Sequence, residues 1–249
     1  MRKKTFAMNV LAPAALLCVS ACLSWAEMSA QEILEQVDRT VNAPEDQKMT
    51  ATLVLIDKNG GRQERVIEIV QKGSDKRLAR FLAPADQEGI AVLTVPEGLI
   101  YVYLPAYKTV KRIASHVKNN KFAGTDFTYE DMEARDYSRS YNGELLREEA
   151  DAYVLELVPA ERGSDYSRLV MWVRRDNFLP TATEFYDRKG NLVKKMTSST
   201  AEKVDGYWIS RETEMIDLTQ DHRSRMILDD IEFDTGLSDD VFTTRYLQR

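Results

Sequence analysis

From residue 49 onward, apolar and polar residues alternate in short runs that turn residues separate. Alternation with a period of two is typical of β-strands that place one face on a core. The run Lys-Asn-Gly-Gly at residues 58–61 predicts a hairpin turn between two of these strands. We count about eleven strands, among them residues 137–145, 191–203 and 206–217. The pattern predicts a mainly β (α+β) domain built on a single antiparallel sheet.

One earlier stretch has the period of a helix. Ser29 and Glu32 form a capping box, and apolar residues follow at helical spacing up to Val41. The helix is expected to end before residues 42–44, Asn-Ala-Pro. Two roles are open for it: it packs on the sheet as an ordinary amphipathic helix, or it closes one end of a cavity.

The strand pattern stops at residues 121–132, Lys-Phe-Ala-Gly-Thr-Asp-Phe-Thr-Tyr-Glu-Asp-Met. Gly124 permits a turn conformation that other residues resist. Thr128 and Asp131 form a weak capping box, which predicts a short helix over about residues 128–134. An isolated turn or two of helix is unstable in water, so its apolar side should pack on the sheet. The segment is either a loop with a helical turn or a lid over a cavity in the sheet.

Several strands are apolar on both faces, as in Leu53-Val-Leu55 and Leu169-Val-Met-Trp172. A sheet with one solvated face would alternate more cleanly, and the few predicted helices cannot cover so much apolar surface. A long antiparallel sheet must curl, close or split to bury one face. We therefore expect either a barrel with a filled interior or a curled sheet around a cavity that an apolar ligand occupies.

The first twenty-six residues resemble an export signal, with Arg2, Lys3 and Lys4 before an apolar core. Cleavage after Ala26 would release residues 27–249 as a single domain. Alternatively, Val19-Ser-Ala-Cys22 resembles a lipobox, in which Cys22 becomes a lipidated N-terminus after removal of residues 1–21. Both cysteines lie in this segment, so the folded domain should contain no disulfide. The sequence predicts an exported protein in the periplasm.

Charge and chemistry narrow the possible functions. The formal net charge is −6, and it becomes −9 without the three basic residues of the signal segment. This balance argues against a nucleic-acid partner, which would need a basic stripe. His116 and His222 have no metal-ligand spacing, and solvated histidine is the expected role of both. The sequence shows no nucleophile elbow, phosphate loop or dinucleotide motif. We expect no metal, no cofactor and no catalytic residue.

Two stretches carry a family resemblance: residues 124–132, Gly-Thr-Asp-Phe-Thr-Tyr-Glu-Asp-Met, and residues 103–113, Tyr-Leu-Pro-Ala-Tyr-Lys-Thr-Val-Lys-Arg-Ile. With the export signal and the β-meander, they resemble the outer-membrane lipoprotein-sorting protein family, the LolA/LolB-like periplasmic carriers. The resemblance implies a half-open barrel whose apolar cavity is closed by short lid helices. It also implies acyl chains of a lipid or lipoprotein as ligand, an inner-membrane transporter of RND type as partner, and a monomer.

One departure from the family pattern affects the predicted ligand. Lipoprotein carriers of the family place an arginine next to a proline after the third strand, where it hydrogen-bonds the lid. Residues 70–77 contain no proline, and Lys72 or Arg77 could only approximate that role. We therefore expect a lipid or lipopeptide carrier rather than a strict lipoprotein carrier. Two other classes stay open: a regulator that senses lipoproteins, and a structural adaptor without a ligand.

The predicted ligand site consists of large apolar residues near the middle of strands, although the sequence does not show which face of each strand points inward. Ordinary core packing is the alternative role for each residue. The wall candidates are Leu53, Leu55, Ile67, Ile69, Leu93, Tyr101, Tyr103, Val170, Trp172 and Phe185. The lid motif comprises Gly124, Asp126, Phe127, Tyr129, Asp131 and Met132.

Overall fold

The computed structural model describes residues 28–133 and 136–249. The predicted signal segment and Cys22 lie outside these residues. The described residues contain two α-helices, α1 (Ala30–Val41) and α2 (Tyr137–Ser140). The strands are β1 (Asp46–Ile56), β2 (Arg62–Lys72), β3 (Lys76–Ala83), β4 (Ala91–Val95), β5 (Leu99–Leu104), β6 (Thr109–Ile113), β7 (Tyr141–Glu148), β8 (Ala152–Pro159), β9 (Tyr166–Arg174), β10 (Pro180–Asp187), β11 (Leu192–Ser198), β12 (Ala201–Val204), β13 (Tyr207–Ser210), β14 (Glu212–Asp217) and β15 (His222–Phe233).

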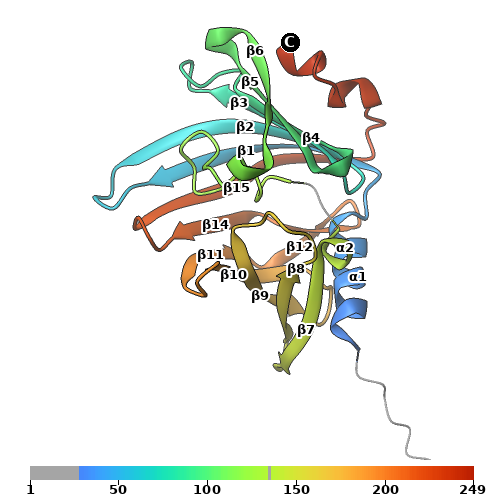
Figure 1. The fold of residues 1–249 in the computed structure, drawn as a ribbon. Coiled ribbons are helices and arrows are strands. Elements are labelled where there is room, and N and C mark those ends of the chain that lie inside the picture. The colour runs from blue at the N-terminus through green and yellow to red at the C-terminus, as the bar shows by residue number, and fades with distance from the viewer. Residues whose placement is uncertain (1–27, 134–135) are drawn as a thin grey trace, which may run out of the picture.

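Thirteen of these strands form one antiparallel sheet in the order β6-β5-β4-β3-β2-β1-β15-β14-β11-β10-β9-β8-β7. The chain builds one half as a meander from β1 to β6, and β15 returns to pair with β1. β6 and β7 are the edges, so the sheet stays open within the described residues. Strand direction changes strongly between β1–β2 and β7–β9 (Figure 1). The mainly β class and the single large antiparallel sheet are confirmed.

Two of the predicted strands are each divided into two shorter strands. β12 and β13 form a separate two-stranded sheet, where continuous strands were expected over residues 191–203 and 206–217. The division falls at Ser199, whose backbone N–H still donates to Glu212 O at 2.8 Å. The Ser199 hydroxyl in turn accepts from Glu212 N. At this point a hydrogen bond to the Ser199 side chain replaces regular pairing between strands. The alternation of apolar and polar residues continues past Ser199, so it did not reveal the division.

Two expectations for the chain after residue 121 need correction, a helix over residues 128–134 and a strand from residue 137. Residues 128–133 form one hydrogen-bonded turn, with Met132 N donating to Thr128 O at 3.2 Å, rather than a helix. The helix in this region is instead α2, in a stretch that was expected to be strand. Asp38 of α1 accepts from Tyr137 N at 2.6 Å and from Ser138 N at 2.9 Å. A residue far away in the sequence therefore caps α2, and no local pattern could reveal it.

Three apolar clusters hold the sheet together. The first joins α1 to β7–β10 and β14, as the capping box and the helical spacing of Ile33, Leu34 and Val37 predict. The second lies on the inner face of β1–β5 and includes Phe122. Phe127 packs against both of these clusters. The third covers the outer face of β2–β4 with the C-terminal segment, residues 235–249, which lies beside β4 in Figure 1.

Asp46 attaches this C-terminal segment to the start of β1. Its buried carboxylate accepts from Thr235 N, Thr235 Oγ1 and Leu237 N, each at 2.8 Å. Burial raises the pKa of Asp46, but these hydrogen bonds outweigh that effect and hold the pKa below its usual value. The ionised carboxylate therefore stabilises the attached segment.

We expect Asp46→Ala to lower the free energy of unfolding by about 1–3 kcal/mol, because it leaves buried N–H groups without acceptors. Urea unfolding measures this difference. A carboxyl with a depressed folded pKa contributes its full stability above the unfolded pKa near 3.9, and the contribution disappears as pH falls through the folded value. The difference between the two proteins should therefore shrink only below about pH 4. An equal difference at pH 2 would contradict this explanation.

Candidate ligand-binding cavity

An apolar cavity of ≈ 330 Å³ lies between the two halves of the sheet. Its walls come from β1–β3 on one side, β9–β11 on the other, and β14–β15 between them. The end of α1, the start of α2 and residues 122–133 complete the lining. The volume lies at the lower end of the roughly 300–1,000 Å³ that is typical of ligand pockets. The cavity thus has room for a narrow ligand.

Strand pleating explains which side chains reach the cavity. Alternate residues of a strand point to one face, so Met49 and Leu53 of β1 lie on the cavity side together with Ile67 and Ile69 of β2. The register aligns Met171, Thr183, Met196 and Met215 in one row across β9, β10, β11 and β14. All four line the cavity. The Thr183 hydroxyl is buried there with no hydrogen-bond partner among the described residues, so it can donate to a ligand oxygen.

Methionine is the most frequent residue of the lining. Six of the nine methionines in the chain line the cavity: Met49, Met132, Met171, Met196, Met215 and Met226. Methionine is unbranched and polarizable, so a wall of methionines adapts to ligands of different shape. Met132 belongs to the predicted lid motif, whereas the other five were not among the predicted wall residues, which are branched or aromatic. Met171 lies in an apolar run, whereas Met196 and Met215 are large apolar residues in largely polar strands, and that isolation was the signal that could have identified them.

The ten wall candidates divide between the two faces of the sheet. Leu53, Ile67, Ile69 and Phe185 line the cavity. Leu55 is buried in the second cluster without being part of the lining. Leu93, Tyr101 and Tyr103 pack on the outer face against the C-terminal segment, and Val170 and Trp172 alternate with the inward Leu169 and Met171. The placement of these last five in a cavity wall was wrong, because both faces of their strands are apolar.

The lid segment, residues 118–133, covers the cavity with Phe122, Phe127 and Met132. It folds back on itself through Phe122 N, which donates to Phe127 O at 2.8 Å. Gly124 adopts φ +78° at the turn, as its permissive backbone predicts. Thr128 and Asp131 make the reciprocal hydrogen bonds of a capping box, at 2.8 and 3.1 Å. The lid motif thus forms a folded segment over the cavity; Tyr129 contacts Phe122 and lies outside the lining.

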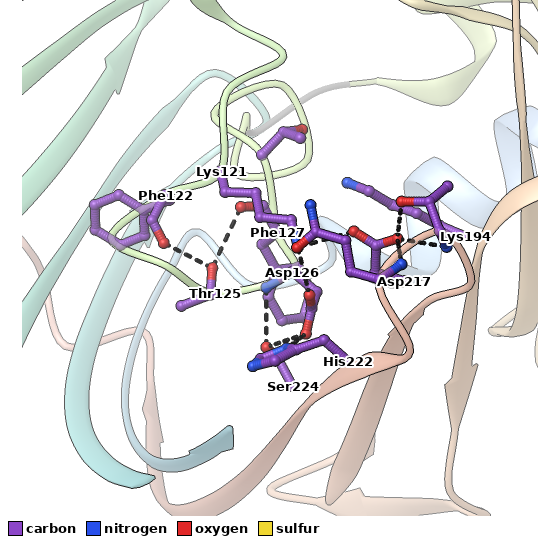
Figure 2. A network of polar contacts seen from close by, with 12 residues as sticks. Lys121, Phe122, Thr125, Asp126, Phe127, Lys194, Asp217, His222 and Ser224 are labelled. Atoms are coloured by element: carbon purple, nitrogen blue, oxygen red, sulfur yellow. Dashed lines mark hydrogen bonds and ion pairs between the residues drawn. The ribbon is translucent and has the colours of Figure 1, made fainter. Parts of the chain in front are cut away.

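Asp126 joins the lid segment to the β14–β15 hairpin (Figure 2). Its carboxylate is fully buried and contacts Lys121 Nζ at 2.9 Å, His222 Nδ1 at 2.6 Å and Ser224 Oγ at 2.8 Å. Lys121 Nζ also lies 2.8 Å from Asp217 Oδ2. We call Lys121, Asp126, Asp217, His222 and Ser224 the Asp126 latch. His222 is therefore hydrogen-bonded to the lid, and the expectation of a solvated histidine was wrong.

The ion pair between Lys121 and Asp217 persists over a wide pH range. Burial lowers the pKa of Lys121, but hydrogen bonds to Asp217 and Asp126 outweigh it and raise the pKa above its usual value. Burial raises the pKa of Asp217, but hydrogen bonds from Lys121 and Thr219 lower it overall. The lysine contributes stability that is lost only as pH rises through its raised pKa, and Asp217 contributes stability that is lost only in acid. This ion pair therefore stays intact at neutral pH.

A second buried contact holds the other end of the lid segment. Asp131 Oδ2 lies 3.0 Å from Lys194 Nζ of β11, and the side chains are 6% and 9% exposed. Tyr166 of β9 donates its hydroxyl to Asp131 at 3.2 Å. Burial, together with the nearby carboxylates of Asp131 and Glu130, raises the pKa of Tyr166 far above its usual value, so the hydroxyl stays protonated and donates. The lid segment is thus fixed to both halves of the sheet.

An arginine also holds the lid segment, but at a position that the sequence did not indicate. Arg65 of β2 is buried, donates to the Ala123 carbonyl and lies over the Phe81 ring. Phe81 in turn stacks on Phe122 of the lid, with 5.2 Å between the ring centroids. Lys72, one of the two residues expected to approximate this role, contacts Asp239 of the C-terminal segment at 3.1 Å instead. Arg77, the other, lines the cavity.

Polar side chains gather at one end of the cavity. Gln71 Oε1 accepts from Arg77 Nε at 2.9 Å and from Arg77 Nη2 at 2.5 Å. Gln71 Nε2 donates to Asn42 Oδ1 at 3.2 Å. Glu133 and Tyr141 line this cavity and also a neighbouring polar groove of ≈ 1060 Å³. The apolar cavity therefore adjoins a polar groove.

Within residues 28–133 and 136–249, no group of three histidine, cysteine, aspartate or glutamate side chains could hold a metal ion. The helices of the same residues are all too short or too polar to span a membrane.

The open antiparallel sheet, the helix α1 and the lid over an apolar cavity define the class of lipoprotein-carrier-like folds, and comparisons with known proteins agree. A candidate outer membrane lipoprotein-sorting protein domain from Vibrio parahaemolyticus is 30% identical, with a TM-score of 0.80 over 88% of this chain and 100% of that chain. A DUF1329 family protein from Desulfovibrio piger is 29% identical, with a TM-score of 0.82 over 88% and 97%. A LolA superfamily protein from Nitrosomonas europaea shares the fold at 23% identity, with a TM-score of 0.76 over 88% and 100%.

The chain belongs to the outer membrane lipoprotein-sorting protein family. A family model described as "Uncharacterized protein" matches residues 73–249. The curated proteins include no match to the chain.

Proposed function

We propose that this protein is a periplasmic carrier that binds the acyl chains of a lipid or lipoprotein in the cavity under the lid. The observation that carries the proposal is the apolar cavity under the lid, with six methionines in its wall. Burying an acyl chain is favourable by about 0.8 kcal/mol for each CH₂ group removed from water. One chain therefore binds usefully and still reversibly, as a carrier requires.

A carrier of this kind needs no catalytic group, but it needs a lid that can open. The lid segment is held by individual polar contacts, at Asp126, Asp131 and Arg65, rather than by a continuous strand pairing. Such contacts can be exchanged for contacts with a partner protein. We infer that an inner-membrane transporter of RND type is this partner. The name of the relative from Vibrio parahaemolyticus supports a role in the cell envelope.

A variant that fills the cavity tests the proposal. Met196 is half-buried and lines the cavity at the centre of the β9–β14 row. We expect Met196→Trp to weaken the binding of a fluorescent fatty acid at least about tenfold, because the indole occupies space that the chain needs. The cost in folding stability should be about 1–3 kcal/mol, so the domain still folds. Fluorescence titration measures the affinity, and circular dichroism checks the fold.

Lys195→Trp is the matched control. Lys195 is the next residue of the same strand, and its side chain points to the outer face, where it pairs with Glu184 at 2.8 Å. This variant should bind the fatty acid within about twofold of the unaltered protein, because it leaves the cavity wall intact. Equal binding by both variants would place the ligand elsewhere. Absence of binding by the unaltered protein would favour a structural adaptor with a filled core.

A further inference from the structure

Thr183 places a hydroxyl in the cavity wall, and this hydroxyl has no partner in the described part of the chain. The residue lies in the middle of β10, lines the cavity and is 1% exposed. No described residue forms a hydrogen bond with its Oγ1 atom. Burying a hydroxyl in this way is unfavourable, because the group loses its hydrogen bonds to water and gains none. Buried polar groups are almost always paired, so an unpaired one requires an explanation.

The neighbours of Thr183 cannot satisfy its hydroxyl. The register places Met171 of β9 and Met196 of β11 directly beside it, and Met215 of β14 follows in the same row. Phe185 lines the cavity two residues further along β10. None of these side chains has a hydrogen-bond donor, and a thioether sulfur is only a weak acceptor. A good partner for the hydroxyl can therefore come from a molecule inside the cavity.

Other polar side chains of the wall are paired within the protein. Thr125 Oγ1 donates to Phe122 O at 2.8 Å, and Asp131 Oδ2 lies 3.0 Å from Lys194 Nζ. Thr183 differs from them in that its hydroxyl contributes no such contact. Valine has the same shape and suits a β-strand as well as threonine does. The hydroxyl therefore does not stabilise the ligand-free protein, and contact with a ligand is the role left for it.

A bound chain can reach Thr183 because methionines surround it. Methionine is unbranched and has several rotatable bonds, so a ligand atom can displace a methionine side chain at low cost. Met196 is half-buried and is the most accessible of the three neighbours in the row. The volume of ≈ 330 Å³ fits one chain rather than several. A threonine hydroxyl donates to a carbonyl or hydroxyl oxygen, and it also accepts from a hydroxyl.

We propose that Thr183 donates a hydrogen bond to an oxygen of the bound acyl chain, and that the cavity thereby selects chains that carry such an oxygen. This inference rests on the proposed carrier function. The oxygen is either the carbonyl that joins the chain to its head group or a hydroxyl on the chain itself. Both are neutral acceptors. A chain without an oxygen at this position leaves the Thr183 hydroxyl unpaired and gains nothing from it.

Two sets of ligands distinguish these sources by displacement of a bound fluorescent fatty acid. Palmitoyl-lysophosphatidylcholine and its hexadecyl ether analogue differ only in the ester carbonyl. Stearate differs from a series of hydroxystearates, with the hydroxyl at successive carbons, only in that hydroxyl. The set in which the oxygen-bearing ligand responds to substitution of Thr183 identifies the source. In the second set, the hydroxystearate that responds most also gives the depth of Thr183 along the chain.

Thr183→Val removes the hydroxyl and keeps the shape of the side chain. It should weaken the oxygen-bearing ligand of one set about tenfold, and it should leave the oxygen-free ligand within about twofold. Thr183→Ser keeps the hydroxyl and should retain most of the preference. Thr197→Val is the matched control, because Thr197 is exposed on β11 next to Met196. This control should change the affinity of no ligand by more than about twofold.

The stability of the ligand-free protein separates recognition from a structural role. Thr183→Val should unfold at the same urea concentration as the unaltered protein or at a higher one, since it removes an unpaired buried hydroxyl. A clearly lower urea midpoint would overturn the assignment, because the hydroxyl would then be paired within the protein. Equal effects of Thr183→Val on the two members of each set would also overturn it and leave the carrier proposal standing. Absence of binding by every ligand would overturn both.

Discussion

Replacing Lys194 by methionine should lower the free energy of unfolding by about 3–5 kcal/mol, the cost of leaving a buried carboxylate without its cation. Lys194 is almost fully buried, and it contacts Asp131 at 3.0 Å. Methionine keeps the length and the apolar stem of the lysine, so the loss of stability reflects the missing charge rather than a cavity left by a shorter side chain. Asp131 would keep the Tyr166 hydroxyl and Thr128 N as donors, which limits the loss to this range. Urea unfolding measures the change.

The double variant Asp131→Asn/Lys194→Met separates the charge from the packing. Asparagine keeps an oxygen that can accept from Thr128 N, so the turn of the lid segment remains capped. Replacing both members of a buried ion pair is often close to neutral, and the double variant should therefore recover most of the loss. Lys195→Met, on the exposed face of the same strand, should change stability by less than about 1 kcal/mol. A double variant as unstable as Lys194→Met alone would contradict this account of the pair.

Asp126→Ala should open the lid segment more often. The carboxylate contacts Lys121, His222 and Ser224, and its loss should cost about 2–4 kcal/mol. Lys121 keeps Asp217 at 2.8 Å, so the lysine is not left without a partner. Most of the cost should appear as local opening, because the sheet itself does not depend on the lid contacts. Native-state hydrogen exchange of the Phe122 and Thr125 amides measures it directly.

Gln220→Ala is the matched control for Asp126→Ala, because Gln220 contacts the same lysine, Lys121. Gln220 is exposed and accepts from Lys121 Nζ at 3.0 Å, while Asp126 and Asp217 remain in Gln220→Ala. We expect this variant to exchange at nearly the original rate. Uptake and release of a bound chain should both become faster in Asp126→Ala, with little change in the equilibrium affinity. Lid exchange in Asp126→Ala equal to that of Gln220→Ala would show that the Asp126 latch does not hold the lid.

Together the two variants address how the lid opens. Lys121 attaches the lid segment to β14, Asp126 attaches it to β15, and Asp131 attaches it to β9 and β11. β11 and β14 pair with each other in the continuous sheet, and the chain between them forms the separate β12–β13 hairpin. A partner that bends the sheet at this point would strain both attachments at once.

Local patterns predicted the parts of the fold that local interactions determine. The bounds of β4, β5 and β6 follow from the alternation and from Pro96 and Pro105, which open the turns on either side of β5. The capping box of Ser29 and Glu32 marks the start of α1. The Thr128–Asp131 pair forms its expected hydrogen bonds, although the chain leaves the helical path after one turn.

The faces of the strands could not be predicted where both faces are buried. Tyr101 and Tyr103 point away from the cavity because the C-terminal segment covers the outer face of their strand. That cover depends on Asp46, which lies about 190 residues before the segment that it holds. The roles of Lys194 and Arg65 could not be predicted for the same reason. Each is a charged residue that would normally be exposed on its strand, and only the folded lid gives it a buried partner. The polar part of the site is thus a product of tertiary contacts.

The measurement that tests the carrier proposal most directly is mass spectrometry of organic extracts from the protein. The full chain is expressed with its own signal segment and purified from the cell envelope without detergent. The account predicts a stoichiometric, single-chain amphiphile or lipopeptide in the extract of the unaltered protein and its loss from Met196→Trp. A well-folded protein that yields no lipid and takes up none when lipid is added would contradict the carrier function.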